Sequence, residues 1–319
     1  MNYLVTGGTG LIGSRIARDL VREGHKVVVY DWDPSLDSLE RVLDVEEIKS
    51  GINVVKGDVT DLRELSRVLK NNKVEIVIHT ASLLTLESNS DPINALRINC
   101  EGTLCVFELA KRLGLKKIVW SSSNAAFGPP CLYADEFIPN NAPKYPQDVY
   151  GATKSFNEDV AGYYIKHHGL DITGIRYMNV YGGGGQQGGF FGPIVRELII
   201  NPALGKRGKV PYGDALLGWS YVDDPARASV MASKVSKPKT GTFSIMGDVR
   251  SVRDAAKYVR KILPDVQLDV LAGGVTAIPV KFDTTPIEIE IGYYPEWSME
   301  RGLKETINLV RFEHGLSAI

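Results

Sequence analysis

The segment TGGTGLIG occupies residues 6–13, between the β-branched run YLVT and a stretch with apolar residues at helical spacing. A strand, a glycine-rich turn and a helix in this order are typical of the phosphate-binding start of a dinucleotide-binding fold. Glycines let the backbone approach a pyrophosphate, and the helix N-terminus offers unpaired N–H groups and a positive dipole end. The segment therefore predicts cofactor contacts at Gly7, Gly10, Leu11, Ile12 and Gly13.

The next strand is expected at KVVVY, residues 26–30, and Asp31 ends it. A carboxylate about 20 residues after the glycines accepts hydrogen bonds from the adenosine ribose hydroxyls and repels a 2′-phosphate. The following Trp32, Asp33 and Pro34 offer no arginine to neutralise such a phosphate. The sequence therefore favours NAD over NADP, although Asp31 could also be an acidic turn residue.

Short apolar runs alternate with amphipathic stretches through the first half of the chain. The runs are continuous, as in parallel strands that helices cover on both faces. Strands are expected at 3–6, 26–30, 52–58, 74–81 and 116–123. Helices are expected from Leu11, near 35–49, at 61–70 and at 94–114. Repeated β-α units with right-handed crossovers predict an α/β fold with a doubly wound parallel Rossmann sheet.

The pattern loosens after residue 180. The segment YGGGGQQGG (181–189) holds six glycines and is expected to be a loop beside a ligand. Later segments predict a smaller C-terminal substrate-binding lobe, with elements near 190–200, 219–222, 243–247, from 251 and at 298–314. We therefore expect an NAD-binding Rossmann domain at 1–180, with return segments near 219–247, and a mainly substrate-binding lobe at 181–319.

The composition narrows the class of protein. The 319 residues carry a net charge of −1, which gives no basic surface for nucleic acid or an anionic membrane. Three cysteines in apolar contexts suggest reduced thiols rather than disulfides or a metal site. No apolar run reaches the roughly 18 residues that span a bilayer, and a strand is expected from the second residue, which leaves no room for a signal peptide. We expect a cytoplasmic protein with no membrane, nucleic-acid or metal partner.

The motifs together resemble the extended short-chain dehydrogenase/reductases, the group that includes nucleotide-sugar epimerases and dehydratases. The resemblance runs nearly end to end. It rests on TGGTGLIG (6–13), GDVTD (57–61), VIHTAS (77–82), NCEGT (99–103), WSSSNAAFG (120–128), YGATK (150–154), RYMNVYG (176–182), YVDDPARA (221–228) and GYYPEWSMERGLKETI (292–307). It implies that Asp58 and Val59 lie at the adenine and that Ala81 and Asn99 line the cofactor cleft. Without it, Asn99 is equally well a helix-cap or turn residue.

The resemblance also implies a catalytic set of Ser123, Tyr150 and Lys154. Tyr150 would remove a proton from a substrate hydroxyl while hydride passes to NAD. Lys154 would support the phenol and contact the nicotinamide ribose, and Ser123 would hold the substrate oxygen. Tyr150 is the only one of 14 tyrosines with a lysine four residues later, an offset that puts both side chains on one helix face. A nearby ammonium and oxidised nicotinamide are both expected to lower the phenol pKa from its usual ~10.

The substrate is less defined. Asn179 matches a family position that often contacts substrate, or it is a strand-end residue. Leu217 stands where nucleotide-sugar enzymes usually carry a diphosphate-binding arginine, and the run TAIPVKFD (276–283) lacks their second arginine. Four cations could replace these arginines or could be solvated surface charges: Arg196, Lys206, Arg207 and Lys209.

Three functions remain open at this point. The leading one is an NAD-dependent dehydrogenase or reductase of a small secondary alcohol or ketone, and NAAFG is similar to the threonine dehydrogenase branch of the family. The alternative is a nucleotide-sugar (UDP-sugar) 4-epimerase that transfers hydride transiently with tightly bound NAD. The third is a catalytically silent NAD-binding protein, which the complete Ser123–Tyr150–Lys154 set argues against.

The resemblance implies a homodimer, because family members commonly pair through helices that match 94–114 and 150–169. Val106, Leu109, Ala110, Ala161 and Tyr164 could supply that face, or they could pack on the sheet.

Overall fold

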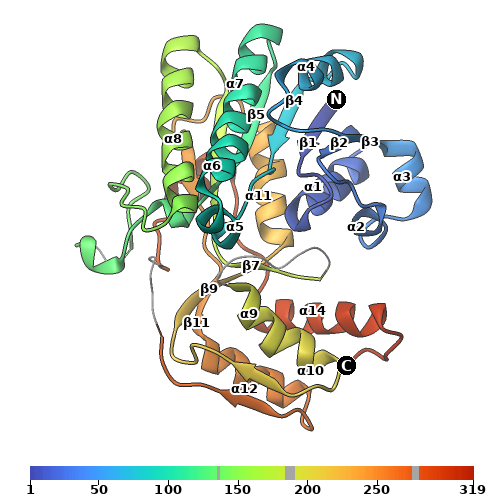
Figure 1. Ribbon diagram of the computed structural model, residues 1–319, viewed down its shortest axis with the longest axis vertical. Helices are drawn as coiled ribbons and strands as arrows, with labels where there is room; N and C mark the ends of the chain where they lie inside the picture. The colour runs from blue at the N-terminus through green and yellow to red at the C-terminus, as the bar shows by residue number, and fades with distance from the viewer. Residues whose placement is uncertain (135–136, 184–190, 275–279) are drawn as a thin grey trace.

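A parallel seven-stranded sheet organises the larger part of the molecule in the computed structural model, which describes residues 1–134, 137–183, 191–274 and 280–319 (Figure 1). Its order is β10-β6-β5-β4-β1-β2-β3. The strands are β1 (Asn2–Thr6), β2 (Lys26–Asp31), β3 (Ile52–Lys56), β4 (Ile76–His79), β5 (Lys117–Ser123), β6 (Ile172–Tyr177) and β10 (Thr242–Ser244). The strand order reverses between β1 and β4, so a crevice for a ligand is expected at the carboxyl ends of these two strands. The expected doubly wound Rossmann sheet is confirmed.

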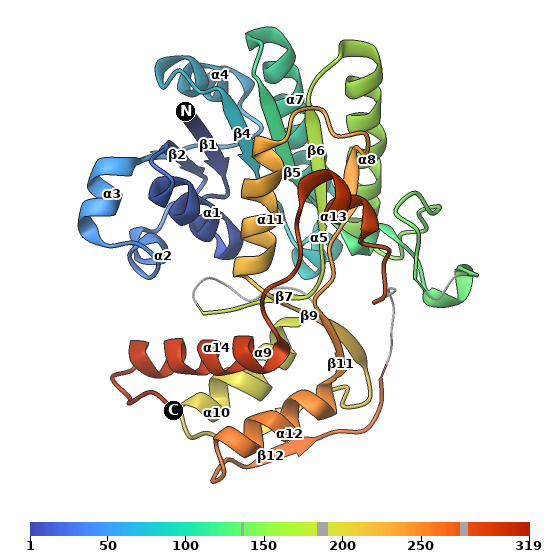
Figure 2. The ribbon, with the colours of Figure 1, turned by 180° about the vertical axis from the view of Figure 1, so that it is seen from behind.

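Helices cover both faces of this sheet (Figures 1 and 2). One face carries α4 (Leu62–Asn71), α7 (Gly102–Leu113) and α8 (Val149–His168), whose apolar side chains form one core with β4 and β5. The other carries α1 (Leu11–Arg22), α11 (Asp223–Lys234) and α13 (Thr285–Ile291). Because both faces are buried, the strands have the continuous apolar sequences noted above.

The smaller lobe lies beneath the carboxyl ends of the large sheet (Figure 2). It contains two small sheets, β11-β9-β7 and β12-β8. Its strands are β7 (Val180–Tyr181), β8 (Gly208–Val210), β9 (Leu216–Tyr221), β11 (Asp248–Ser251) and β12 (Leu268–Val270). Its helices are α9 (Phe191–Val195), which continues as a π-helical turn η4 (Arg196–Ile200) into α10 (Asn201–Ala203), α12 (Val252–Ile262) and α14 (Met299–Glu313). Trp219 is fully buried here, so it belongs to the core of this lobe.

The chain passes between the two parts more than once. Of the segments expected to return near 219–247, α11 and β10 join the large sheet, where β10 pairs with β6, and β9 stays in the small lobe. The later helix α13 also packs on the large sheet. Several chain connections therefore join the small lobe to the Rossmann part.

Two expected helices are interrupted. The stretch 94–114 is divided into α6 (Pro92–Ala95), a π-helical turn η1 (Leu96–Glu101) and α7, and it follows a short α5 (Thr85–Ser90). The widened turn contains Asn99, whose side chain is turned inward and bonded to neighbouring elements. The stretch 35–49 breaks into α2 (Leu36–Glu40) and α3 (Val45–Gly51), because Asp44 caps a new helix through the Glu47 amide. No helix in the described ranges has both the length and the apolar character needed to cross a membrane.

Candidate active site

The glycine turn between β1 and α1 is built for close approach. Gly7 has φ +64°, and a Cβ there would lie 2.8 Å from the Ala81 backbone nitrogen at the end of β4. A Cβ on Gly13 would lie 2.1 Å from the Gly7 carbonyl oxygen. Gly10 is exposed at the start of α1, and no side chain caps the helix. The turn and the first N–H groups of α1 therefore form a cradle that suits a pyrophosphate.

Asp31 is fixed against this turn. Its Oδ2 accepts hydrogen bonds from the Thr9 backbone N–H at 3.1 Å and the Thr9 hydroxyl at 2.8 Å. The carboxylate thus sits at the end of β2 beside the glycines, where the sequence places it for an adenosine ribose. The sequence analysis did not single out Thr9. Its position between two glycines of the motif was the only feature that could have indicated a role in this turn.

The expected adenine-site residues have different environments. The Asp58 Oδ1 accepts from the Thr60 amide and hydroxyl, and its Oδ2 pairs with Arg97 at 2.9 Å. Asp58 and Arg97 are about half exposed, so this pair lies at the surface of the crevice. The Val59 side chain is buried against Gly102, so it belongs to the core and only its backbone can face a ligand.

Asn99 is buried and bonded entirely to the protein. Its Oδ1 accepts from the Leu83 amide at 2.8 Å and from the Ser82 hydroxyl at 3.1 Å. Its Nδ2 donates to the Leu83 carbonyl at 3.0 Å and to the Thr153 hydroxyl at 3.2 Å. Asn99 therefore joins the segment after β4 to α8 and shapes the cleft, rather than capping a helix.

The structure brings Ser123, Tyr150 and Lys154 together. Asp148 caps α8 by accepting the Gly151 amide at 2.7 Å, which places Tyr150 in the first turn and Lys154 one turn later. The Lys154 ammonium donates to the Ser121 carbonyl at 2.8 Å and lies 5.5 Å from the centre of the Tyr150 ring. Ser123 ends β5, its hydroxyl accepts the Ala125 amide at 3.1 Å, and it lies close enough to the Tyr150 phenol to affect the pKa of that group. One hydroxyl, one phenol and one ammonium thus meet at the carboxyl end of β5.

Burial controls the protonation of this group. It raises the pKa of the Tyr150 phenol to about 12, and the hydrogen bond with Ser123 works in the opposite direction. Burial lowers the pKa of Lys154 to about 7, against the influence of Cys100 and Glu158. The protein's own groups therefore do not lower the phenol pKa as the sequence suggested. That lowering would have to come from the positive charge that oxidised nicotinamide brings.

In the part of the chain that is described, Asn179 and Asn124 are among the residues near this site that have buried amide atoms without a hydrogen-bond partner. Asn179 follows β6 with φ +36°, a strained conformation for a residue with a side chain, and its Nδ2 has no partner. Asn124 directly follows Ser123, is fully buried, and neither its Oδ1 nor its Nδ2 has a partner. Unsatisfied buried amides call for a functional or solvent partner. The sequence indicated Asn179 but not Asn124, whose only signal was a polar residue beside the catalytic serine.

The four cations considered for the substrate from the sequence, Arg196, Lys206, Arg207 and Lys209, are all exposed. Arg196 and Arg207 are largely exposed and pair with Glu197 and Asp269, as solvated surface charges do. Leu217 is buried in the core of the small lobe. Residues 184–189 of the glycine-rich segment and residues 276–279 of the run 276–283 lie outside the described residues.

Comparison with known proteins identifies the family. The model of the NAD dependent epimerase/dehydratase family matches residues 3–245. The chain belongs to this family. It is accordingly an NAD-dependent enzyme of the extended short-chain dehydrogenase/reductase type, and the glycine cradle and Asp31 fit that cofactor. Among the described residues, no group of three His, Cys, Asp or Glu side chains could hold a metal ion.

Several similar proteins carry the names of enzymes that act on nucleotide sugars. A UDP-N-acetyl-alpha-D-glucosaminuronate decarboxylase of Bacillus cytotoxicus is 28% identical and covers 97% of both chains. The crystal structure of a UDP-glucose 4-epimerase from Thermotoga maritima with UDP-glucose has a TM-score of 0.84 and 26% identity, covering 98% of this chain and 100% of that one. A partial consensus L-threonine 3-dehydrogenase has a TM-score of 0.86 at 23% identity, covering 98% and 100%, which shows a shared fold.

Proposed function

We propose that this protein is a nucleotide-sugar 4-epimerase or closely related enzyme, which acts on a UDP-sugar by transient hydride transfer. The observation that carries the proposal is that Ser123, Tyr150 and Lys154 lie together at the end of β5, and that the chain also forms a glycine cradle after β1. The names of similar proteins, a UDP-sugar decarboxylase and a UDP-glucose 4-epimerase, support this substrate class over the small secondary alcohol that the sequence first suggested.

The roles of the residues follow from their contacts. Bound NAD supplies a reversible hydride acceptor. The Tyr150 phenolate takes the proton of the substrate hydroxyl, and the same phenol returns it to the carbonyl oxygen. The Ser123 hydroxyl, which contacts the phenol, holds the substrate oxygen and stabilises its developing negative charge. The Lys154 ammonium is held by the Ser121 carbonyl 5.5 Å from the centre of the phenol ring, and it would contact the nicotinamide ribose.

Cofactor contacts are proposed for the residues around the crevice. Gly7, Gly10, Leu11, Ile12 and Gly13 would hold the pyrophosphate through backbone N–H groups, and Asp31 would hold the adenosine ribose. The residues at the adenine and along the cleft are Asp58, Val59 through its backbone, Ala81 and Asn99. For Asn99 we propose an indirect role, because its amide is already used by Leu83 and Thr153.

The amide side chains of Asn179 and Asn124 are proposed to contact the substrate. The Asn179 Nδ2 has no partner among the described residues and would donate to an oxygen of the nucleotide sugar. With Leu217 in the core instead of an arginine at the site, such neutral donors would carry more of the diphosphate recognition. The small lobe lies beneath the carboxyl ends of the large sheet and would therefore form the other side of the substrate site.

The second candidate is an NAD-dependent dehydrogenase of a small secondary alcohol. The specific observation in its favour is the buried Leu217, because a substrate without a diphosphate needs no arginine at that position. The catalytic group would act in the same way, but NADH would leave as a product.

One experiment separates the candidates. The purified protein would be incubated with NAD and either a panel of UDP-sugars or a panel of secondary alcohols that includes L-threonine. Proton NMR would follow sugar inversion, and absorbance would follow NADH. An inverted or otherwise converted UDP-sugar without net NADH supports the proposal. Net NADH from an alcohol alone would replace it with the second candidate, and no reaction with either panel would contradict both.

We also infer a homodimer in the cytoplasm. The face considered from the sequence is not available, because the structure buries Val106, Leu109, Ala110, Ala161 and Tyr164 in the core. Other apolar side chains on α8, α5 and the α6–η1 segment are exposed instead: Phe156, Tyr163, Leu86, Ile93 and Leu96. Their exposure supports pairing through these helices, and light scattering tests it. The free thiols of all three cysteines are consistent with a reducing compartment.

A further inference from the structure

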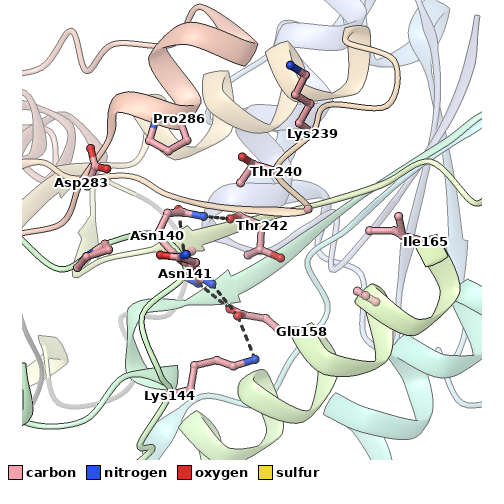
Figure 3. Close-up of a pocket in the computed structure, with 15 residues that line it drawn as sticks. Asn140, Asn141, Lys144, Glu158, Ile165, Lys239, Thr240, Thr242, Asp283 and Pro286 are labelled. Carbon is pink, nitrogen blue, oxygen red and sulfur yellow. Dashed lines mark hydrogen bonds and ion pairs between the residues drawn. The ribbon is translucent and has the colours of Figure 1, made fainter.

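A buried charge, Glu158, lies between the proposed catalytic group and a cavity of about 530 Å³ beside the later turns of α8. The cavity is lined by polar and charged side chains that include Asn140, Lys144, Glu158, Arg176, Lys239 and Thr242. Figure 3 shows Glu158 and Lys144 pointing toward one another, with Asn140 alongside. Glu158 thus lines this cavity and also contacts β5, the strand that carries Ser123, through Ser122.

The Glu158 carboxylate is fully engaged. Its Oε1 accepts from the Ser122 hydroxyl at 2.6 Å and from the Arg176 Nε at 2.8 Å. Its Oε2 accepts from an Arg176 terminal nitrogen at 2.8 Å and lies 3.5 Å from the Lys144 ammonium. Arg176 itself is anchored to the Asn140 carbonyl at 2.8 Å. Two charged side chains are thus held in one bidentate arrangement, which fixes both orientation and charge.

This network reaches the proposed catalytic residues by two routes. Ser122 stands between Ser121, whose carbonyl receives the Lys154 ammonium, and Ser123, which contacts the phenol. The bond from Ser122 to Glu158 therefore fixes the end of β5 on which both contacts depend. Glu158 also follows Lys154 by one turn of α8, and its negative charge acts on the ammonium across that turn.

Other charged and titratable groups around these two residues come from each neighbouring element. Arg176 and Tyr177 come from β6, Lys144 precedes α8, Cys100 comes from η1, and His79 comes from β4. Burial lowers the pKa of His79 to about 3, so this ring is neutral. Burial tends to raise the pKa of Glu158, but Arg176 outweighs it and the carboxyl pKa lies below its usual range. Glu158 is therefore the ionised group that opposes the desolvation of Lys154.

We propose that Glu158, held by Arg176, is a positioning residue that fixes the β5 end at Ser122 and keeps a negative charge one helical turn from the Lys154 ammonium. It touches neither substrate nor cofactor and acts through Lys154 and the strand end. This inference rests on the proposed roles of Ser123, Tyr150 and Lys154. A purely structural role for the ion pair would change stability but not the protonation of Lys154.

The first test reads the protonation of Lys154 without any substrate. Lysine labelled at Cε would be observed by NMR, and the signal lost in Lys154→Met would assign the residue. In Glu158→Gln the titration midpoint of this signal is expected to fall, because the negative charge that favours the ammonium is gone. Asp159→Asn is the matched control, since the neighbouring Asp159 also pairs with Lys144 but is largely exposed. An unmoved midpoint in Glu158→Gln, or an equal shift in Asp159→Asn, would overturn the proposal.

The second test uses the cavity. Glu158→Ala leaves a space continuous with the cavity beside Arg176, so sodium acetate at increasing concentration can supply a carboxylate from solution. Turnover is expected to fall by about tenfold or more, the change that one pKa unit represents, and acetate should restore part of it while sodium chloride does not. Failure of acetate to act on a folded variant with lowered turnover would contradict the proposal.

Ser122→Ala covers the case in which Glu158→Ala does not fold. It removes only the 2.6 Å bond to Glu158, so turnover should fall while NAD affinity is unchanged. Wild-type turnover in Ser122→Ala would contradict the proposal that Glu158 acts on the site through the end of β5. If no UDP-sugar is converted by the wild type, the proposed substrate fails, and the lysine titration still decides the role of Glu158.

Discussion

Lys154 lies one helical turn beyond Tyr150, with its ammonium 5.5 Å from the centre of the phenol ring, and its hydrogen bond goes to the Ser121 carbonyl rather than to the phenol. The strand end therefore positions the lysine independently of the tyrosine. Removal of the phenol oxygen should leave the lysine, the cleft and the cofactor cradle in place. This separation makes the proposed roles testable one residue at a time.

Tyr150→Phe should reduce turnover by about 10²- to 10⁴-fold, the range for loss of a general acid or base. NAD affinity should stay within about twofold of the wild type, because the glycine cradle and Asp31 are untouched. Turnover by NMR and NAD affinity by calorimetry would check this. Tyr163→Phe, on the exposed side of the same helix, is the control. Wild-type-like turnover in Tyr150→Phe would remove the proposed base.

Lys154→Met should change the pH dependence of stability. Burial holds the pKa of Lys154 at about 7 in the folded chain, well below its value of 10.5 when exposed. The unfolded state therefore binds more protons between these two values, so this lysine costs most stability below pH 7 and progressively less as pH rises toward 10.5.

The upper limit of this cost is about 4 to 5 kcal/mol, from about 1.4 kcal/mol per pKa unit. Lys154→Met should therefore be more stable relative to wild type in mildly acidic than in alkaline buffer. Urea unfolding across that pH range measures it. A stability difference that does not change with pH would show that the ammonium is not desolvated in the folded chain.

Asp31→Asn should weaken the preference for NAD over NADP, because the carboxylate that repels a 2′-phosphate is gone. The ratio of the two dissociation constants should change by about tenfold or more, equivalent to 1.4 kcal/mol. Asp33→Asn is the matched control, since Asp33 is largely exposed and pairs loosely with Lys56. An unchanged ratio in Asp31→Asn would assign Asp31 only to the turn that it forms with Thr9.

Gly13→Ala and Gly162→Ala should have opposite effects on stability. The added methyl on Gly13 would lie 2.1 Å from the Gly7 carbonyl oxygen, and overpacking of this kind costs about 1 to 3 kcal/mol. The added methyl on Gly162 meets no atom within 4 Å, so it should stabilise α8 by roughly 0.5–1 kcal/mol. Thermal unfolding with and without NAD would measure both, and only Gly13→Ala should lose the stabilisation by NAD.

The large sheet and the proximity of the proposed catalytic residues could be predicted because their signals are local. Continuous apolar strands, the glycine motif and the Tyr150–Lys154 offset each lie within a few residues of sequence. The small lobe was less predictable, since strands as short as Gly208–Val210 and Leu268–Val270 have too few residues to show a period. The break at Asn99 was missed for another reason: its side chain bonds to Leu83 and Thr153, and such contacts have no local signature.

The lack of a local signature also explains why the contacts that support the site could not be predicted from the sequence. The bond from Ser122 to Glu158 joins residues 36 apart, and the pair of Glu158 with Arg176 joins a helix to a strand. Glu158 and Arg176 were not singled out from the sequence, where both resemble ordinary charged positions. Their partners are distant in the sequence, so these contacts can be recognised only in the folded chain.

The central claim is that Tyr150 exchanges a proton with a carbinol whose hydrogen moves to NAD. The most direct measurement uses a UDP-sugar deuterated at the reacting carbon, converted by the enzyme in ordinary water. The account predicts transient NADH absorbance and a product that keeps its deuterium, with neither seen in Tyr150→Phe. Loss of the deuterium to solvent, or conversion by Tyr150→Phe at the wild-type rate, would contradict it.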